Sequence, residues 1–369
     1  MKNKHYLALL IAMAWSCGAL AKPSVTPVAF LPDAAHVTAT YTVTRVEREP
    51  GSKGSLRYQW PGAYFETAFK GTSAFFAVGK GDVILRVLVD GDQVATLKKP
   101  AVGYYEVQGL SKSEHRLRVE AVTESQAGAN EFGGFYLPKS EKNVAIKPRP
   151  RQIEFIGDSH TVGYGNTSDD RECTEEQVWE RTDNSQAFGP ITARHFDADY
   201  QVNAISGRGI VRNYNGGPND TMPIAYPFVL FDHAQRGNNP NWNPQWIVIS
   251  LGTNDFSTEL HDGEKWKSRD ELHVDFEKTF VQFVHELRKK KPHAHLLFWA
   301  TSSLNQEIPD EVAKVVSQLR ATGENDIGFI PIPDLAMDGC HYHPSIKDHQ
   351  KIAKALMDFI EARAGGWKD

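Results

Sequence analysis

The second half of the chain alternates short apolar runs with segments of helical periodicity, and this alternation restricts the fold more than any other feature. Strands that alternate with helices form a mainly parallel sheet covered on both faces. We therefore expect residues 152–369 to form a three-layer α/β/α domain with a five-stranded parallel sheet, in flavodoxin-like strand order. The predicted strands are 153–156, 200–205, 246–251, 295–301 and 327–332, and the predicted helices are 186–196, 272–291, 310–321 and 346–364.

The preceding region, residues 22–140, has a β pattern throughout and no segment of helical period. Short β-rich runs lie at 37–44, 55–60, 64–69, 73–78, 82–90, 93–97, 115–122 and 132–137, separated by turn signals such as Pro61-Gly62. Short strands at regular spacing predict an all-β sandwich or jelly roll. Its aromatic residues suit either a sugar-stacking surface or a core, and we favour the core for most of them; they are Trp60, Tyr64, Phe65, Tyr104 and Tyr105. Residues 141–151, with alternating proline and charge, resemble a linker between domains.

The first 21 residues have the pattern of a signal peptide. Lys2 and Lys4 precede an apolar run over residues 6–15, and Ala19-Leu20-Ala21 is a small-x-small cleavage site. The apolar run is too short to span a bilayer. We expect a mature chain that begins at Lys22 and is secreted or periplasmic, without a membrane partner. The net charge of −5 argues against a nucleic-acid partner, because such proteins usually present a basic face.

Two cysteines remain beyond this leader, Cys173 and Cys340. An even pair in an exported protein suggests a disulfide. The alternative is two small buried thiols that pack as apolar groups. If the disulfide forms, it joins the loop after Ser159 to the loop around His343.

Four polar segments follow predicted strands, and the carboxyl ends of parallel strands are where such folds bind ligands. Acyl transfer needs a nucleophile, a base within hydrogen-bond reach and donors for the developing oxyanion. Each segment alone could be an ordinary turn or helix cap. All four in this order favour a catalytic site. They are Gly157-Asp158-Ser159, Ser206-Gly207-Arg208-Gly209, Gly252-Thr253-Asn254-Asp255 and Asp338-Gly339-Cys340-His341-Tyr342-His343-Pro344.

On these four blocks the chain resembles the SGNH, or GDSL-type, hydrolase superfamily. With a β domain in front, Ser-Gly-Arg-Gly and Gly-Cys-x-x-His-Pro-Ser, it looks like carbohydrate esterase family two over nearly the whole mature chain. The resemblance implies that Ser159 is the nucleophile and His343 the general base. It also implies an oxyanion hole made by the Ser159 and Gly207 amides and the Asn254 side chain. The implied activity is removal of O-acetyl groups from xylan and related polysaccharides, glucomannan among them, without a cofactor or metal.

One position departs from the superfamily pattern. Many SGNH enzymes carry Asp three residues before the catalytic histidine, where this chain has Cys340. We favour a Ser–His dyad in which a backbone carbonyl orients His343, with Asp338 or His341 as alternative orienting groups. Cys340, His341 and His343, with Asp348, could instead bind zinc. We consider this metal reading the weaker one, since no other cluster has ligand spacing.

Two further functions stay open at this stage. The first is a carbohydrate-binding protein whose hydrolase site is vestigial; the second is an exported lipase or thioesterase with the same chemistry. We expect the chain to be a monomer.

Overall fold

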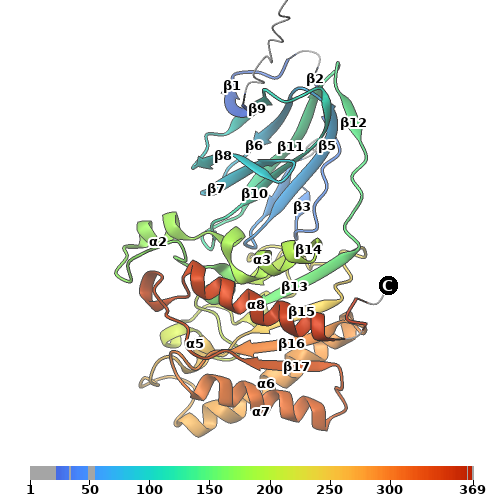
Figure 1. Ribbon diagram of the computed structural model, residues 1–369. Helices are drawn as coiled ribbons and strands as arrows, with labels where there is room; N and C mark the ends of the chain where they lie inside the picture. Colours follow the sequence, from blue (N-terminus) through green and yellow to red (C-terminus); the bar gives the residue numbers. More distant parts are fainter. Residues whose placement is uncertain (1–21, 33–34, 49–54, 364, 368–369) are drawn as a thin grey trace, which may run out of the picture.

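The computed structural model describes residues 22–32, 35–48, 55–363 and 365–367, so the expected signal peptide and the last residue of the predicted helix 346–364 lie outside it. The chain forms two stacked domains, an antiparallel β domain and an α/β domain (Figure 1). Among the described residues, no helix is long and apolar enough to cross a membrane.

The α/β domain is built on five parallel strands in the order β14-β13-β15-β16-β17. This confirms the five-stranded parallel sheet and its flavodoxin-like order. The predicted strand limits differ from the observed ones by a few residues at most. The strands are β13 (Arg151–Gly157), β14 (Ala198–Ala204), β15 (Trp246–Ser250), β16 (His295–Ala300) and β17 (Ile327–Pro331).

Helices cover both faces of this sheet. Neighbouring strand residues point to opposite faces, so Phe155 belongs to one core and Ile156 to the other. The core containing Phe155 is closed by α3 (Phe188–His195) and α8 (Ile346–Ala362), and the core containing Ile156 by α6 (Arg269–Lys290) and α7 (Glu307–Ala321). The shorter helices are α1 (Ser159–Val162), α2 (Glu175–Arg181), α4 (Met222–Ala225), α5 (Thr253–Phe256), η1 (Asn184–Gln186), η2 (Tyr214–Gly216) and η3 (Cys340–Tyr342).

The β domain is a sandwich of two antiparallel sheets. One sheet has the order β1-β9-β6-β11-β4-β3 with β2 also paired to β11, and the other has the order β12-β5-β10-β7-β8. Its strands are β1 (Ser24–Val28), β2 (Ala35–Thr38), β3 (Glu47–Arg48), β4 (Leu56–Tyr58), β5 (Tyr64–Gly71), β6 (Ala74–Val78), β7 (Ile84–Val89), β8 (Asp92–Lys98), β9 (Gly103–Gln108), β10 (Ser113–Ala121), β11 (Asn130–Pro138) and β12 (Lys142–Val144).

The sequence pattern missed four of these strands, β1, β3, β9 and β12. The strand expected at 37–44 is only β2, followed by a single bridge at Tyr41. β12 lies within the segment 141–151 and pairs with β5. Strand pairing of this kind depends on a distant edge being available, which a local pattern does not show.

Most of the aromatic residues weighed for sugar stacking are buried, as we expected. Phe65 stacks on Phe132 inside the sandwich, with ring centroids 4.2 Å apart. Trp60 and Tyr64 instead pack into the two cores of the α/β domain. Trp60 Nε1 donates to the carbonyl of Phe228 at 3.1 Å, and the Tyr64 hydroxyl donates to Asp199 at 2.7 Å. These two residues therefore join the domains through buried, hydrogen-bonded contacts.

A charged cluster at the same interface centres on Glu66 of β5, whose side chain is 1% exposed. It pairs with Arg116, with Arg118 at 3.2 Å and with Arg149 at 3.3 Å; Arg149 also reaches Asp199 at 2.9 Å. Burial by itself raises the pKa of Glu66, but the surrounding arginines outweigh it and hold the pKa at about 2. The cluster ties β5, the 141–151 segment and β14 together.

We predict that Glu66→Ala lowers the free energy of unfolding at pH 7 by about 3–5 kcal/mol, because it removes the buried carboxylate that Arg116, Arg118 and Arg149 share. Chemical denaturation followed by fluorescence measures the change. The matched control is Glu47→Ala, which removes a partly exposed pair with Arg57 and should cost less than about 1 kcal/mol.

The pH dependence provides a second check on Glu66. A carboxylate with a depressed pKa stabilises the fold above its unfolded value near 4.5, and this contribution is lost as the pH falls toward 2. The difference in free energy of unfolding between the wild type and Glu66→Ala should therefore become smaller as the pH falls from about 4.5 toward 2. Equal losses for Glu66→Ala and Glu47→Ala at pH 7 would contradict this assignment.

Candidate active site

The register of the central strands brings three of the four polar segments to one sheet edge. Gly157, the last residue of β13, is paired with Ala204 of β14 and with Ser250 of β15. The segments that follow these strands therefore begin side by side. The fourth segment follows β17 and precedes α8.

Gly157-Asp158-Ser159 forms the transition from β13 into α1. Asp158 is the N-cap of this short helix, and its carboxylate accepts a hydrogen bond from the N–H of His160 at 3.0 Å. Ser159 is the first helical residue, so its own N–H has no partner within the helix. The side chain of Ser159 is buried at the sheet edge.

The structure brings Ser159 and His343 together, with His343 Nε2 2.9 Å from the Ser159 hydroxyl. The other ring nitrogen, Nδ1, lies 2.9 Å from the carbonyl oxygen of Cys340 and 3.1 Å from that of His341. Carbonyl oxygens only accept, so Nδ1 carries the proton and Nε2 is left to accept from Ser159. The pair has the geometry of a Ser–His dyad oriented by main-chain carbonyls.

Neither alternative orienting side chain approaches His343. The Asp338 carboxylate is 2.8 Å from Arg171 in a partly exposed ion pair. The His341 ring lies 2.7 Å from the Cys173 carbonyl oxygen and 3.1 Å from the Tyr164 hydroxyl. His341 thus contributes its backbone carbonyl to His343 and its ring to the neighbouring loop.

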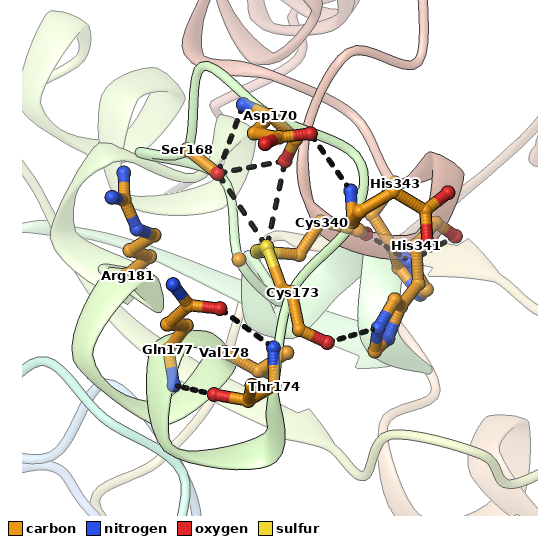
Figure 2. The surroundings of a disulfide bond; sticks show 12 residues. Ser168, Asp170, Cys173, Thr174, Gln177, Val178, Arg181, Cys340, His341 and His343 are labelled. Atoms are coloured by element: carbon orange, nitrogen blue, oxygen red, sulfur yellow. Dashed lines mark hydrogen bonds between the residues drawn. A yellow bond between two sulfur atoms is a disulfide. The ribbon is translucent and has the colours of Figure 1, made fainter.

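Cys173 and Cys340 form a disulfide across 167 residues of sequence. It joins the loop that follows Ser159 to the loop that precedes His343. Figure 2 shows the bond with His341 beside it, reaching the Cys173 carbonyl. His341 and Tyr342 both have left-handed backbone conformations, with φ of 51° and 60°. Such conformations persist where the surroundings fix them. Here the backbone N–H groups of Cys340 and His341 donate to the carbonyls of Gly165 and Arg171, at 3.2 and 2.7 Å.

Gly165 is required by close packing against this disulfide. A Cβ atom at Gly165 would lie 2.4 Å from Cys340 Cβ and 2.8 Å from its sulfur, and its φ is +55°. Gly165 N also donates to the Thr182 hydroxyl at 2.9 Å. The glycine lets the segment after Ser159 pass directly over the cysteine whose carbonyl orients His343.

Two rings enclose His343. The Tyr164 ring lies against it with centroids 4.3 Å apart, and the His160 ring lies edge-on to it with centroids 5.6 Å apart. Burial lowers the pKa of His343 to about 4, although its two carbonyl contacts act in the opposite direction. Burial also lowers the pKa of His160 well below its usual value. The sequence marked His343, but nothing in the pattern singled out Tyr164.

The three expected oxyanion donors have the following surroundings. Within the described residues, neither Ser159 N–H nor Gly207 N–H donates to a protein acceptor. Asn254 Nδ2 donates to the Arg208 carbonyl at 2.9 Å and makes a longer contact of 3.3 Å with Asp158. Both amide hydrogens of Asn254 therefore have a protein acceptor, and the one directed to Asp158 makes the longer and weaker contact.

A buried carboxylate fixes the loop that contains Gly207. Asp255 accepts from the N–H groups of Ile210, Val211 and Arg212 at 2.9–3.0 Å. Burial raises the pKa of Asp255 to about 6 and, together with the nearby Asp255 charge, that of Asp158 to about 7. Asp255 thus attaches the loop after β14 to the start of α5, next to Asn254.

The zinc alternative loses one of its ligands in this arrangement, because the Cys340 sulfur is in the disulfide. Across the part of the chain that the structure describes, no group of three or more His, Cys, Asp or Glu side chains is placed to hold a metal ion.

Comparison with known families divides the chain as the fold does. Residues 45–146 match the carbohydrate esterase 2 N-terminal family, and residues 153–356 match the GDSL-like lipase/acylhydrolase family. The chain is 42% identical, over 368 residues and the full length of both proteins, to an acetylxylan esterase / glucomannan deacetylase of Cellvibrio japonicus.

Solved structures give the same grouping. A carbohydrate esterase structure described as having divergent catalytic and non-catalytic binding functions in its active site is 43% identical, with a TM-score of 0.85. The match covers 90% of this chain and all of the other. A family two carbohydrate esterase from Clostridium thermocellum, in complex with cellohexaose, is 28% identical with a TM-score of 0.77, covering 89% of this chain and all of that one.

We predict that kcat/KM for a small ester stays high down to about pH 4 and falls only below it, so that the apparent acid pKa of the profile is near 4. A base must be neutral to accept the serine proton. With a pKa of about 4, roughly nine-tenths of His343 would be neutral at pH 5, against a few per cent for an ordinary histidine. Initial rates with 4-nitrophenyl acetate between pH 3.5 and 8, corrected for spontaneous hydrolysis, measure this.

The matched variant for this profile is Tyr164→Ala, which opens one side of His343 to water and should move the acid limb upward toward 6.5. Tyr104→Ala, in β9 of the other domain, is the control and should leave the limb in place. A wild-type limb already near 6.5 would contradict the assignment.

We also predict that replacing both Cys173 and Cys340 by alanine lowers the free energy of unfolding by about 2–5 kcal/mol. The kcat should fall with it, since the residue at 340 carries the carbonyl that orients His343. Denaturation and steady-state rates at 15 °C measure the two effects separately. Added reductant should weaken the wild type and leave the double variant unchanged; a double variant with full kcat would show that the disulfide does not support the orientation of His343.

Proposed function

Because the chain belongs to carbohydrate esterase family two, we propose that it is an exported O-acetyl esterase that deacetylates xylan and related polysaccharides through a serine acyl-enzyme. The observation that carries the proposal is the pairing of Ser159 with a histidine whose far nitrogen donates to two backbone carbonyls. The relative named an acetylxylan esterase / glucomannan deacetylase supports the substrate class. The signal-peptide pattern of residues 1–21 supports export.

The proposed reaction begins with attack of the Ser159 hydroxyl oxygen on the acetyl carbonyl carbon. The serine proton passes to His343 Nε2, and negative charge develops on the carbonyl oxygen. The N–H groups of Ser159 and Gly207 and the side-chain amide of Asn254 then stabilise that charge. Collapse of the tetrahedral intermediate breaks the ester bond, and His343 gives its proton to the departing sugar oxygen.

The second half of the reaction uses the same groups. Water loses a proton to His343 Nε2 and attacks the acetyl-serine carbonyl, and acetate leaves as Ser159 regains its proton. During each half, His343 becomes positively charged. The Cys340 and His341 carbonyls accept from Nδ1–H and stabilise that charge in place of a carboxylate.

We predict that Ser159→Ala abolishes measurable ester hydrolysis and that Asn254→Ala lowers kcat by about 10²–10³, the usual effect of losing one oxyanion donor. The matched control is Asp338→Ala, which should stay within about twofold of wild type because Asp338 pairs with Arg171 and not with His343. Steady-state hydrolysis of 4-nitrophenyl acetate measures all three. Full activity in Ser159→Ala would refute the serine mechanism.

The substrate class has its own test. Acetate release from acetylated xylan and acetylated glucomannan, compared with release of fatty acid from long-chain 4-nitrophenyl esters, separates a deacetylase from a lipase. We expect kcat/KM to be highest for the acetylated polysaccharides. A preference for long chains would redirect the proposal to lipid or thioester substrates.

A second candidate function is binding of a β-linked glucan at the same site without hydrolysis. It is favoured by the cellohexaose complex of the Clostridium thermocellum relative. If it operates, cellohexaose should inhibit deacetylation competitively, and calorimetry with Ser159→Ala should still detect cellohexaose binding. Absence of both effects would remove this second function and leave the esterase proposal standing.

A further inference from the structure

The β domain reaches the catalytic loops through the segment between β10 and β11. This segment is held firmly by its own domain and by the α/β domain. Gln59 Nε2 donates to the carbonyls of Ser125 and Gln126 at 3.1 and 3.2 Å, and Asn130 Nδ2 donates to the Ser125 hydroxyl at 2.8 Å. The N–H of Asn184 donates to the Val122 carbonyl at 2.8 Å. The side chains at 124 and 126 are thus presented from a fixed backbone.

Both of these side chains bind Ser206, the residue before Gly207. Glu124 accepts from Ser206 N–H at 2.8 Å, and Gln126 Nε2 donates to the Ser206 carbonyl oxygen at 3.1 Å. Gln126 Nε2 also donates to Glu124 at 3.2 Å, and Arg208 lies 3.4 Å from Gln126 Oε1. Glu124 therefore holds the Gln126 amide in the orientation that reaches Ser206.

The contact to the Ser206 carbonyl matters because of peptide geometry. The carbonyl of Ser206 and the N–H of Gly207 belong to one planar peptide group and point in opposite directions. A donor bound to the Ser206 oxygen therefore fixes the direction of the Gly207 N–H. This N–H is one of the three donors assigned to the oxyanion in the proposed function.

The local backbone does not by itself fix the orientation of the Ser206–Gly207 peptide. Gly207 has a φ of +81°, and Arg208 N–H donates to the Ile205 carbonyl at 3.3 Å, as in a type II turn. Rotation of the central peptide converts such a turn to type I, and glycine allows both. A Cβ atom at Gly207 would have nothing within 4 Å, so packing does not require a glycine here and its positive φ does. Rotation would turn the N–H away from the substrate.

We propose that Gln126 of the β domain is a positioning residue for the esterase reaction. Its side-chain amide, held by Glu124, fixes the Ser206–Gly207 peptide so that the Gly207 N–H points to the developing oxyanion. The inference rests on the proposed serine mechanism and adds to it that the β domain completes the oxyanion hole. The acylation rate therefore depends on a residue outside the hydrolase domain.

The test compares Gln126→Met, which keeps the length and neutrality of the side chain but removes the donor, with the wild type. Gln126 is exposed, so the variant should fold normally, and its Tm should match that of the wild type. On 4-nitrophenyl acetate, kcat should fall about five- to fiftyfold, less than the 10²–10³ that complete loss of a donor costs. KM should change by less than about twofold, because the small ester does not depend on saccharide contacts.

Gln93→Met is the matched control. Gln93 is an exposed glutamine of β8 whose amide contacts only Thr96 at 3.1 Å among the described residues, and the variant should keep wild-type kcat. A second readout is covalent phosphorylation by diethyl 4-nitrophenyl phosphate, in which the Ser159 oxygen bonds to phosphorus as 4-nitrophenolate leaves. Its phosphoryl oxygen enters the oxyanion hole, so Gln126→Met should slow it by a factor similar to the loss in kcat.

Two results would overturn the inference. One is unchanged kcat and phosphorylation in Gln126→Met. The other is a raised KM for acetylated xylan alone, with normal turnover of 4-nitrophenyl acetate, which would make Gln126 a saccharide contact. Ser159→Ala is measured alongside. If it is inactive while Gln126→Met is fully active, only the positioning role fails; if Ser159→Ala is active, the serine mechanism itself fails.

Discussion

The hydrogen bond from His343 Nδ1–H to the carbonyl of Cys340 is the interaction on which the rest of the site depends. It selects the tautomer that leaves Nε2 free to accept from Ser159. A carboxylate can follow a moving histidine, but a carbonyl is only as well placed as its backbone. The disulfide at Cys340 and the close passage of Gly165 therefore contribute to the geometry of the Ser159–His343 pair, because they hold that backbone in place.

The proposed role of Gln126 also depends on a fixed position of the β domain against the α/β domain. Trp60 and Tyr64 of the β domain pack into the α/β cores, and the Glu66 cluster adds a buried charge network beside them. Ion pairs of this kind lose much of their attraction to desolvation, so they define a relative position better than they add stability. A defined position is what the contact between Gln126 and Ser206 requires, since a hydrogen bond tolerates only small displacements.

The sequence predicted the parts of the site that local patterns encode. An apolar strand that ends at Gly157 and the order of four polar segments predicted a serine and a histidine at one sheet edge. The resemblance to SGNH hydrolases then singled out His343, and the absence of the aspartate of that pattern pointed to a carbonyl as the orienting group. Gln126 carries no comparable signal, because a polar residue in a loop between strands has no period or motif. Its contact with Ser206, 80 residues away, depends on how the domains dock. Tyr164 and the edge strand β12 escaped prediction because their contacts, with His343 and with β5, join residues far apart in the sequence within one domain.

Burial of the ionisable groups near Ser159 also makes the stability of the fold depend on pH in two opposite ways. His160, His343 and His349 are held neutral with lowered pKa values, and such groups destabilise the fold as the pH falls below about 6.5. Asp158 and Asp255 have raised pKa values of about 7 and 6, so their contribution to stability declines as the pH rises from about 4 toward 7. The two sets have opposite slopes over the same interval. Because both kinds of group lie close to Ser159 and His343, the carboxylates partly offset the acid sensitivity that the neutral histidines bring.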